Sequence, residues 1–232
     1  MIKKLSALLL AALCLAGMCS CSRRADITAD GFIVPATGTE YVLCRMFSVY
    51  AVEKGGEYIK YGNEQVYEVE FESAKDFLCV EDSGELLVYR SASSGDISVT
   101  DFDPIAARIY DSSNTRWIAS FFADDEYLEE DQRGINETQD SELCRTIARA
   151  VDEGEAVDLN YDNMAYTNRY FVRLLSQKYP GLYYVVVFFG DNDGRFYLRD
   201  RSINKTVICP RDVLSRMIGN PDYDPGAPAT DL

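Results

Sequence analysis

Apolar and polar side chains alternate along much of the first half of the chain, which is the pattern of β-strands. Residues 65–72 are the clearest case, since apolar side chains and glutamates take turns there. Successive side chains of a strand point to opposite faces, so this segment predicts a half-buried antiparallel strand with a solvated acidic face. The residues predicted to point inward are Tyr67, Val69 and Phe71.

Two β-hairpins are predicted further along this half. Residues 77–80 and 85–90 flank one short segment rich in Asp, Ser and Gly, and residues 105–110 and 115–122 flank another that contains Asp, Ser and Asn. These are the residues that turns favour. Together with a β-rich run at residues 41–52, short strands at this spacing indicate a sandwich or a small barrel.

Helical patterns appear in the second half of the chain. One helix is predicted from residue 143 to Gly154, a second from residue 165 to 178, and a short third one after Pro210. A brief strand is predicted at residues 157–161. Residues 182–189 are apolar throughout, which indicates a central strand covered on both faces.

These patterns predict an α+β protein, in which an antiparallel β-rich sandwich or barrel-like part precedes a smaller α/β part. The acidic stretch between the two parts reads as a solvated linker. In chain order, the expected segments are a signal peptide at 1–20, a tether at 21–30, a β-rich domain at 31–122, an acidic linker at 123–142, an α/β domain at 143–218 and a disordered tail at 219–232.

The first residues have the features of an export signal. Lys3 and Lys4 precede an apolar run at residues 5–17, and polar and charged residues follow it closely. A membrane-spanning helix needs about 20 apolar residues. The run is shorter than that, and no stop-transfer pattern follows it, so it predicts a cleaved signal peptide.

The sequence Met18-Cys19-Ser20-Cys21 resembles the lipobox of bacterial lipoproteins. The resemblance implies that Cys21 is acylated and becomes the first residue of the mature protein, because Ser20 supplies the small residue before the cut. It further implies anchoring in the cell envelope, and Ser22 implies sorting to the outer membrane, with the membrane face left open. Plain secretion is the alternative. The resemblance covers the first tenth of the chain and implies nothing about the folded part.

The composition excludes several kinds of chemistry. The 232-residue chain has no His, which removes Ser-His-Asp and Cys-His nucleophile pairs and imidazole metal ligands. Its 38 acidic and 23 basic residues give a net charge of −15, which argues against nucleic acid as a partner. Motifs for zinc, for a P-loop and for a serine nucleophile are missing as well. The sequence therefore predicts no catalytic residue, metal or cofactor.

Four cysteines other than Cys21 lie in the expected mature part, namely Cys44, Cys79, Cys144 and Cys209. The envelope can be oxidising, so disulfides are allowed, and the simplest of the three pairings joins Cys44 to Cys79 and Cys144 to Cys209. The alternative is four buried thiols that pack as small apolar side chains. The sequence leaves both alternatives open.

Two acidic features resemble functional sites but have simpler explanations. Residues 191–194, Asp-Asn-Asp-Gly, could contribute to a calcium site, yet the spacing does not fit an EF-hand loop and favours a turn. Asp101 and Asp103 could act as the paired carboxylates of a glycoside hydrolase. An acid-rich chain supplies many such pairs, so loop residues are the preferred interpretation.

Aromatic residues raise the alternative of a ligand-binding platform. Tyr183 and Tyr184 open the predicted central strand, and Trp117 lies in a hairpin strand. Aromatic faces can stack on sugars and peptides, but packing in the core is the more ordinary role of such residues. We expect core packing.

The expected function is that of a non-catalytic envelope lipoprotein that binds a protein or envelope component, scaffolds an assembly or captures a ligand. The first alternative is an inhibitor or immunity-type lipoprotein that neutralises a basic partner, because a concentrated acidic field speeds association. Its binding residues would be Asp124, Asp125, Glu129 and Glu130. The second alternative is a hydrolase that uses carboxylates.

Overall fold

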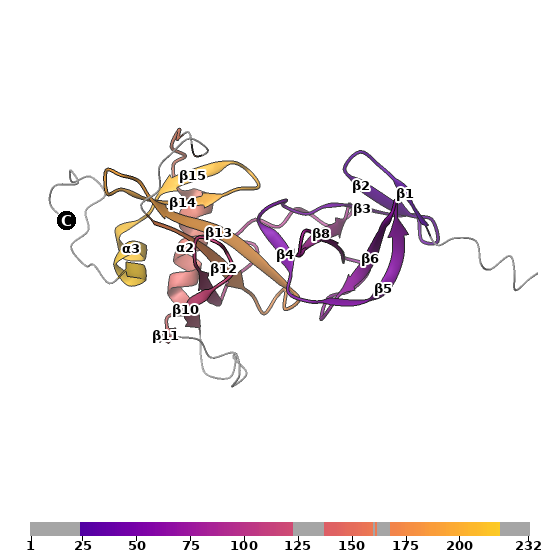
Figure 1. The fold of residues 1–232 in the computed structure, drawn as a ribbon, viewed down its shortest axis with the longest axis horizontal. Helices are drawn as coiled ribbons and strands as arrows, with labels where there is room; N and C mark the ends of the chain where they lie inside the picture. Colours follow the sequence, from indigo (N-terminus) through magenta and orange to yellow (C-terminus); the bar gives the residue numbers. More distant parts are fainter. Residues whose placement is uncertain (1–23, 123–136, 160, 162–167, 219–232) are drawn as a thin grey trace, which may run out of the picture.

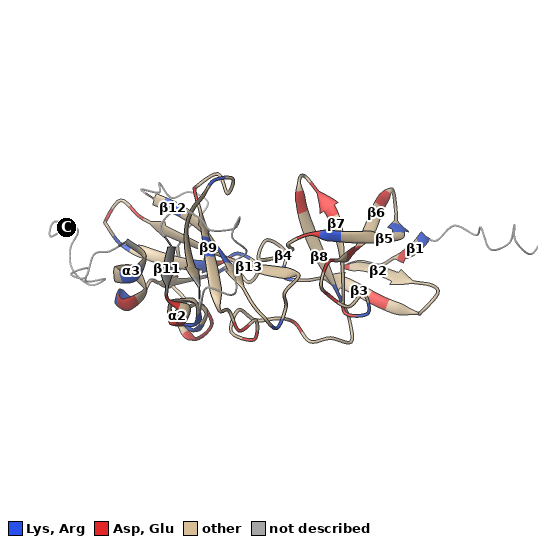
Figure 2. Ribbon diagram, turned by 90° about the horizontal axis from the view of Figure 1, so that it is seen from below, with Lys and Arg blue, Asp and Glu red and all other residues tan. Residues whose placement is uncertain are grey.

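The computed structural model describes residues 24–122, 137–159, 161 and 168–218. Strands hold 47% of these described residues and helices 12%, so the β-rich α+β class is confirmed. Figure 1 shows an elongated molecule with a barrel towards one end and a sheet with two helices towards the other. Figure 2 shows Asp and Glu on both parts, for example on β7 and α2.

The N-terminal part is a closed barrel of seven strands. Around the barrel the order is β8-β3-β2-β1-β5-β6-β7, and pairing of β7 with β8 closes it. Neighbouring strands are antiparallel except for β1 and β5, which are parallel. The strands are β1 (Arg24–Ile27), β2 (Gly31–Val34), β3 (Thr39–Leu43), β5 (Lys54–Tyr61), β6 (Glu64–Val69), β7 (Phe77–Asp82) and β8 (Glu85–Ser91).

Aromatic side chains form much of the hydrophobic cluster that lies within the barrel part. Phe32 is fully buried, and its ring centroid lies 5.5 Å from that of Tyr41 and 5.2 Å from that of Tyr89. The Tyr41 hydroxyl donates a hydrogen bond of 2.6 Å to the Ala74 carbonyl, which satisfies its polar group. Strands β2 and β3 come so close at Gly31 that a Cβ there would lie 2.0 Å from the Tyr41 carbonyl oxygen.

The C-terminal part is a sheet in the order β11-β10-β9-β12-β13-β14-β15 with helices on one face. Helix α2 packs against β9, β10, β14 and β15 and against the second helix, α3. Its buried residues repeat at helical spacing, as the sequence predicts. The elements are β9 (Ala106–Tyr110), β10 (Trp117–Phe122), β11 (Glu137–Gln139), α2 (Ser141–Glu153), β12 (Asn168–Leu175), β13 (Leu182–Gly190), β14 (Phe196–Asp200), β15 (Lys205–Ile208) and α3 (Arg211–Ile218).

A three-residue strand, β4 (Val49–Ala51), joins the two parts. On one side Tyr50 pairs with Leu87 of the barrel strand β8. On the other side β4 pairs with Leu182–Tyr184 at the start of β13, whose last residues pair with β14. Hydrogen bonding is therefore continuous from the barrel into the C-terminal sheet, and loops next to β4 lie at the junction.

Most of the predicted elements are confirmed. Both hairpins form, α2 and α3 begin close to the predicted positions, and β13 is buried along almost its whole length. Strands β9 and β10 pair with the C-terminal part through β12, although the sequence placed them with the β-rich part. The end of the predicted linker contains β11 and the start of α2. Whether the two parts are separate domains stays a prediction.

The predicted helix at residues 165–178 is wrong, because Asn168–Leu175 form strand β12. All eight residues of this strand pair with β13, and five also pair with β9. Both faces of β12 carry buried residues, such as Phe171 on one face and Val172 on the other. Pairing between two neighbours thus outweighs a local helical period. The described residues of the brief strand predicted at 157–161 form no strand, and an isolated bridge joins the preceding Ala156 to Val207.

A second correction concerns Phe71, which the alternating pattern places inside. Strand β6 ends at Val69, and Phe71 lies in the following turn with 74% of its surface exposed. Its φ of 65° is in the left-handed region. The alternation therefore stops two residues earlier than the sequence pattern indicates.

We expect Gly31→Ala to destabilise the barrel, because the new methyl group would displace the backbone of β3. Overpacking of this kind costs about 1–3 kcal/mol. The matched control is Gly95→Ala, where a Cβ meets nothing within 4 Å. The urea unfolding midpoint should fall for Gly31→Ala alone. Equal midpoints for both variants would contradict the close approach of β2 and β3.

Candidate functional site

The four cysteines of the folded part are free thiols buried in one core cluster. The sequence left disulfides and buried thiols as alternatives, and the structure has buried thiols. Neither the Cys44–Cys79 nor the Cys144–Cys209 disulfide is formed. Burial raises the pKa of Cys44 and Cys144 to about 12 and that of Cys79 to about 11, and it also raises the pKa of Cys209. Thiols with raised pKa values are weak nucleophiles, and all four cysteines pack in the core as small apolar side chains.

Two groups of predicted site residues lie outside the described residues. They are the lipidation residue Cys21 and the acidic residues Asp124, Asp125, Glu129 and Glu130.

The Asp191 loop is a hairpin turn between β13 and β14. One carboxylate oxygen of Asp191 accepts hydrogen bonds of 2.9 Å from the backbone N–H groups of Asp193 and Arg195. The other accepts one of 2.9 Å from the Tyr197 hydroxyl. Within the part of the chain that the structure describes, no group of three or more Cys, Asp or Glu could hold a metal ion.

Asp101 and Asp103 have separate partners. Asp101 accepts a hydrogen bond of 2.9 Å from the Ser98 hydroxyl, whereas Asp103 forms an ion pair of 3.4 Å with Arg145 of α2. Asp103 lines a cavity of about 280 Å³ beside α2 that does not include Asp101. The geometry does not favour a pair of carboxylates that act together across a cleft.

The aromatic residues pack within the protein, as expected. Tyr184 is fully buried, and the Trp117 indole N–H donates to the Ala119 carbonyl at 2.9 Å. The guanidinium of Arg173 lies over the rings of Tyr110 and Tyr183, at 3.9 and 4.8 Å from their centroids. Arg173 also donates to the Asn114 carbonyl at 3.1 Å. These contacts fasten the β9–β10 hairpin to β12 and β13.

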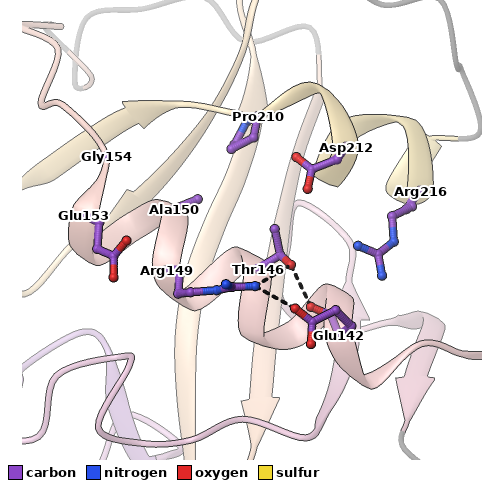
Figure 3. Close-up of a pocket in the computed structure, with 9 residues that line it drawn as sticks. All are labelled: Glu142, Thr146, Arg149, Ala150, Glu153, Gly154, Pro210, Asp212 and Arg216. Carbon is purple, nitrogen blue, oxygen red and sulfur yellow. Dashed lines mark hydrogen bonds and ion pairs between the residues drawn. The ribbon is translucent and has the colours of Figure 1, made fainter.

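A groove of about 560 Å³ lies between α2 and α3. Figure 3 shows Arg149 of α2 directed towards Glu142, with which it forms an ion pair of 2.6 Å. Arg216 of α3 is paired with Asp140, the N-cap residue of α2. Among the described residues that line the groove, both arginines are thus paired with carboxylates of the protein, so neither offers an unpaired positive charge to a ligand.

Two phenylalanines have an unusual backbone conformation. Seven described residues other than glycine have positive φ, among them Phe47 at 69° and Phe71 at 65°. This region is unfavourable for a residue with a Cβ by about 1–2 kcal/mol, and only Gly, Asn and Asp adopt it routinely. Both phenylalanines are exposed as well. A strained, exposed aromatic residue contributes little to stability, and such outliers often occur at functional sites.

Phe47 lies in a tight turn between β3 and β4. The backbone N–H groups of Ser48 and Val49 both donate to the Arg45 carbonyl, at 2.8 and 3.0 Å. The Arg45 guanidinium forms an ion pair of 2.9 Å with Asp96. Met46 and Phe47, between these fixed positions, are 44% and 41% exposed.

Ser48 fixes the other end of the turn through Asp200, a carboxylate that is 1% exposed. One oxygen of Asp200 accepts hydrogen bonds from the hydroxyl groups of Ser48 at 2.7 Å and Ser202 at 2.6 Å, and from the Ser202 N–H at 2.9 Å. The other oxygen accepts a hydrogen bond of 2.5 Å from the Tyr184 hydroxyl. Burial, and then the Asp200 charge, raise the pKa of Tyr184, which therefore remains a neutral donor.

The turn between β14 and β15 completes the surface. The Arg201 guanidinium lies 4.8 Å from the ring centroid of Phe47, and Ile203 is 46% exposed. Nearby, burial raises the pKa of Tyr50; Glu85 raises it further, and Arg201 lowers it. We name Met46, Phe47, Arg201 and Ile203 the junction patch. It is the candidate functional site, and its chemistry is that of a binding surface.

Comparisons with known proteins add no assignment, because no family model, curated protein or solved structure shows significant similarity to this chain. Among the described residues, no helix is both long enough and apolar enough to span a membrane.

The junction patch has no recognisable signal in the amino-acid sequence. Residues 41–52 read as one β-rich run, and the turn at Cys44–Ser48 contains no Gly, Pro, Asn or Asp that would mark it. The residues that hold the turn, such as Asp96 and Asp200, are distant in the sequence. No local signal could have found it.

Because Phe47 is strained, we expect glycine and alanine at this position to have the opposite order of stability from the same two residues at an unstrained strand position. Phe47→Gly should be more stable than Phe47→Ala by about 1 kcal/mol, since glycine has no Cβ to clash in the left-handed region. At Ile208, in strand β15 and 44% exposed, alanine should be the more stable. Denaturant unfolding of the four variants measures both differences. If alanine is the more stable residue at both positions, Phe47 is not strained.

Proposed function

We propose that this chain is a lipid-anchored cell-envelope protein whose folded part is a non-catalytic binding module. The observation that carries the binding role is the junction patch, where a strained, exposed phenylalanine is held by a buried hydrogen-bond network. Natural proteins retain such strain where it serves function, since selection for stability alone would favour Gly or Asn.

The composition of the patch supports a binding role. Interface hot spots are rich in aromatic side chains and Arg, and the core of an interface is apolar. The patch contains Phe47, stacked with Arg201, and the flexible side chain of Met46. A backbone that is already fixed loses less entropy on association, which favours affinity.

Support for the lipid anchor comes from the sequence alone. Acyl chains on Cys21 would contribute about 0.8 kcal/mol for each buried CH₂, and two or more chains make anchoring stable. Strand β1 begins at Arg24, three residues after Cys21 in the sequence. Strand β4, which follows the turn of Met46 and Phe47, lies further along the molecule from β1 (Figure 1).

Neither alternative function has a comparable observation in its favour. The acidic residues on which an inhibitor would depend lie outside the described residues, so that hypothesis stays a prediction. A carboxylate hydrolase would need a convergent pair, and Asp101 and Asp103 each have a different partner.

The anchor is tested by Cys21→Ser, which should move the protein from the membrane fraction to the soluble fraction, because the thiol that would be acylated is removed. Cys19→Ser is the matched control and should leave the protein in the membrane. Fractionation followed by detection of the chain measures both. Membrane retention of Cys21→Ser that equals that of Cys19→Ser would refute lipidation at Cys21.

The binding role is tested with the full chain in envelopes solubilised by a mild detergent. The native protein should migrate in a complex larger than the chain alone. Phe47→Gly, which relieves the strain and removes the ring, should reduce this complex at least about tenfold, as expected for a hot-spot residue. Ile208→Gly is the control for loss of an exposed apolar side chain. A complex that is absent, or unaffected by Phe47→Gly, would refute binding through this patch.

A further inference from the structure

We propose that the junction patch inserts into an apolar pocket of a protein partner and that a carboxylate at the rim of this pocket pairs with Arg201. The inference rests on the proposed binding function and adds the chemical nature of the partner. It follows from the charge of the patch, from its fixed geometry and from its mixture of apolar and cationic side chains.

The charge of the patch argues for a carboxylate on the partner. Arg201 is exposed and forms no ion pair with a carboxylate of the described residues, although the chain has 38 acidic residues. Arg45 and Arg90, by contrast, are both paired with Asp96. The Arg201 guanidinium lies over Phe47, and binding would place both in a less polar environment. A charge that loses water on binding requires an opposite charge, which the partner must supply.

The geometry of the patch argues for a pocket with a defined shape. The turn that carries Met46 and Phe47 is held by the Arg45 carbonyl at its start and by the hydrogen bond of Ser48 to Asp200 at its end. The main-chain carbonyl of Ser48 also accepts a hydrogen bond of 2.6 Å from the Val185 N–H. A fixed backbone aids recognition of a surface that is itself fixed, because less order has to be created on binding.

These properties favour a protein over a lipid surface. Lipid headgroups are fluid, so they offer no fixed pocket for a side chain held at a strained backbone angle. Peripheral membrane binding also depends on basic residues that attract anionic lipids. This chain has a net charge of −15, and Arg201 is the only basic member of the patch. Apolar insertion next to one charge pair is typical of protein interfaces.

The test uses a photoreactive side chain in the full-length protein in intact envelopes. Ile203→p-benzoylphenylalanine places the probe in the patch, and Ile208→p-benzoylphenylalanine places it on β15 with almost equal exposure. The first probe should give one protein adduct of defined mass, and the second should not. Arg201→Glu should lower the yield of this adduct at least about tenfold, whereas Arg201→Lys should largely retain it. The cross-linked partner peptide should lie in an apolar site beside Asp or Glu.

Several results would overturn the inference. They are an adduct with lipid alone, an adduct with a second copy of this chain, an equal protein adduct from the Ile208 probe, or an adduct that Arg201→Glu does not reduce. No adduct from either probe, together with a complex that Phe47→Gly still disrupts, would refute the proposed partner chemistry and leave the binding function intact. Loss of both the adduct and the complex would refute the binding function itself.

Discussion

The buried carboxylate of Asp200 is the interaction on which the junction between barrel and sheet depends. A carboxylate that leaves water loses several kcal/mol of solvation unless hydrogen bonds replace it. Asp200 obtains them from Ser48 before β4, from Tyr184 on β13 and from Ser202 after β14. All three segments must therefore be in place together. Because Ser48 adjoins the strand that links the two parts, the carboxylate couples the barrel to the sheet as well as fixing the turn.

The same network explains how the chain can tolerate strain at Phe47. A left-handed backbone costs about 1–2 kcal/mol, and hydrogen bonds to a charged group contribute about 1.5–3 kcal/mol each. The bond of Ser48 to Asp200 is thus large enough to offset the cost. Phe47 itself is 41% exposed and gains only part of the free energy of burial. This balance favours recognition, rather than stability, as the role of Phe47.

Much of the fold could be predicted from local pattern. The two hairpins have alternating strands and turn-forming residues, and the buried residues of α2 repeat at helical spacing, so each is visible within a short window. Strand β12 could not be predicted in this way, because its identity depends on pairing with β9 and β13, which are distant or later in the chain. Closure of the barrel by β7 and β8 was compatible with the pattern, but a sandwich was equally compatible.

The junction patch could not be predicted for the same physical reason as β12, because it depends on contacts with residues that are distant in the sequence. Its turn is fixed by Asp96 and Asp200, and the turn itself contains no Gly, Pro, Asn or Asp that would have indicated it.

Native-state hydrogen exchange of the Ser202 backbone amide tests the central claim most directly. This N–H donates to Asp200 at 2.9 Å and to the Ser48 hydroxyl at 3.2 Å, although it lies in a turn. If the Asp200 network couples the two parts, the amide should exchange as slowly as that of Val187 in the middle of β13, through global unfolding alone. Exchange as fast as that of an exposed turn residue such as Ser112 would contradict the account, since the network would then open without unfolding the protein.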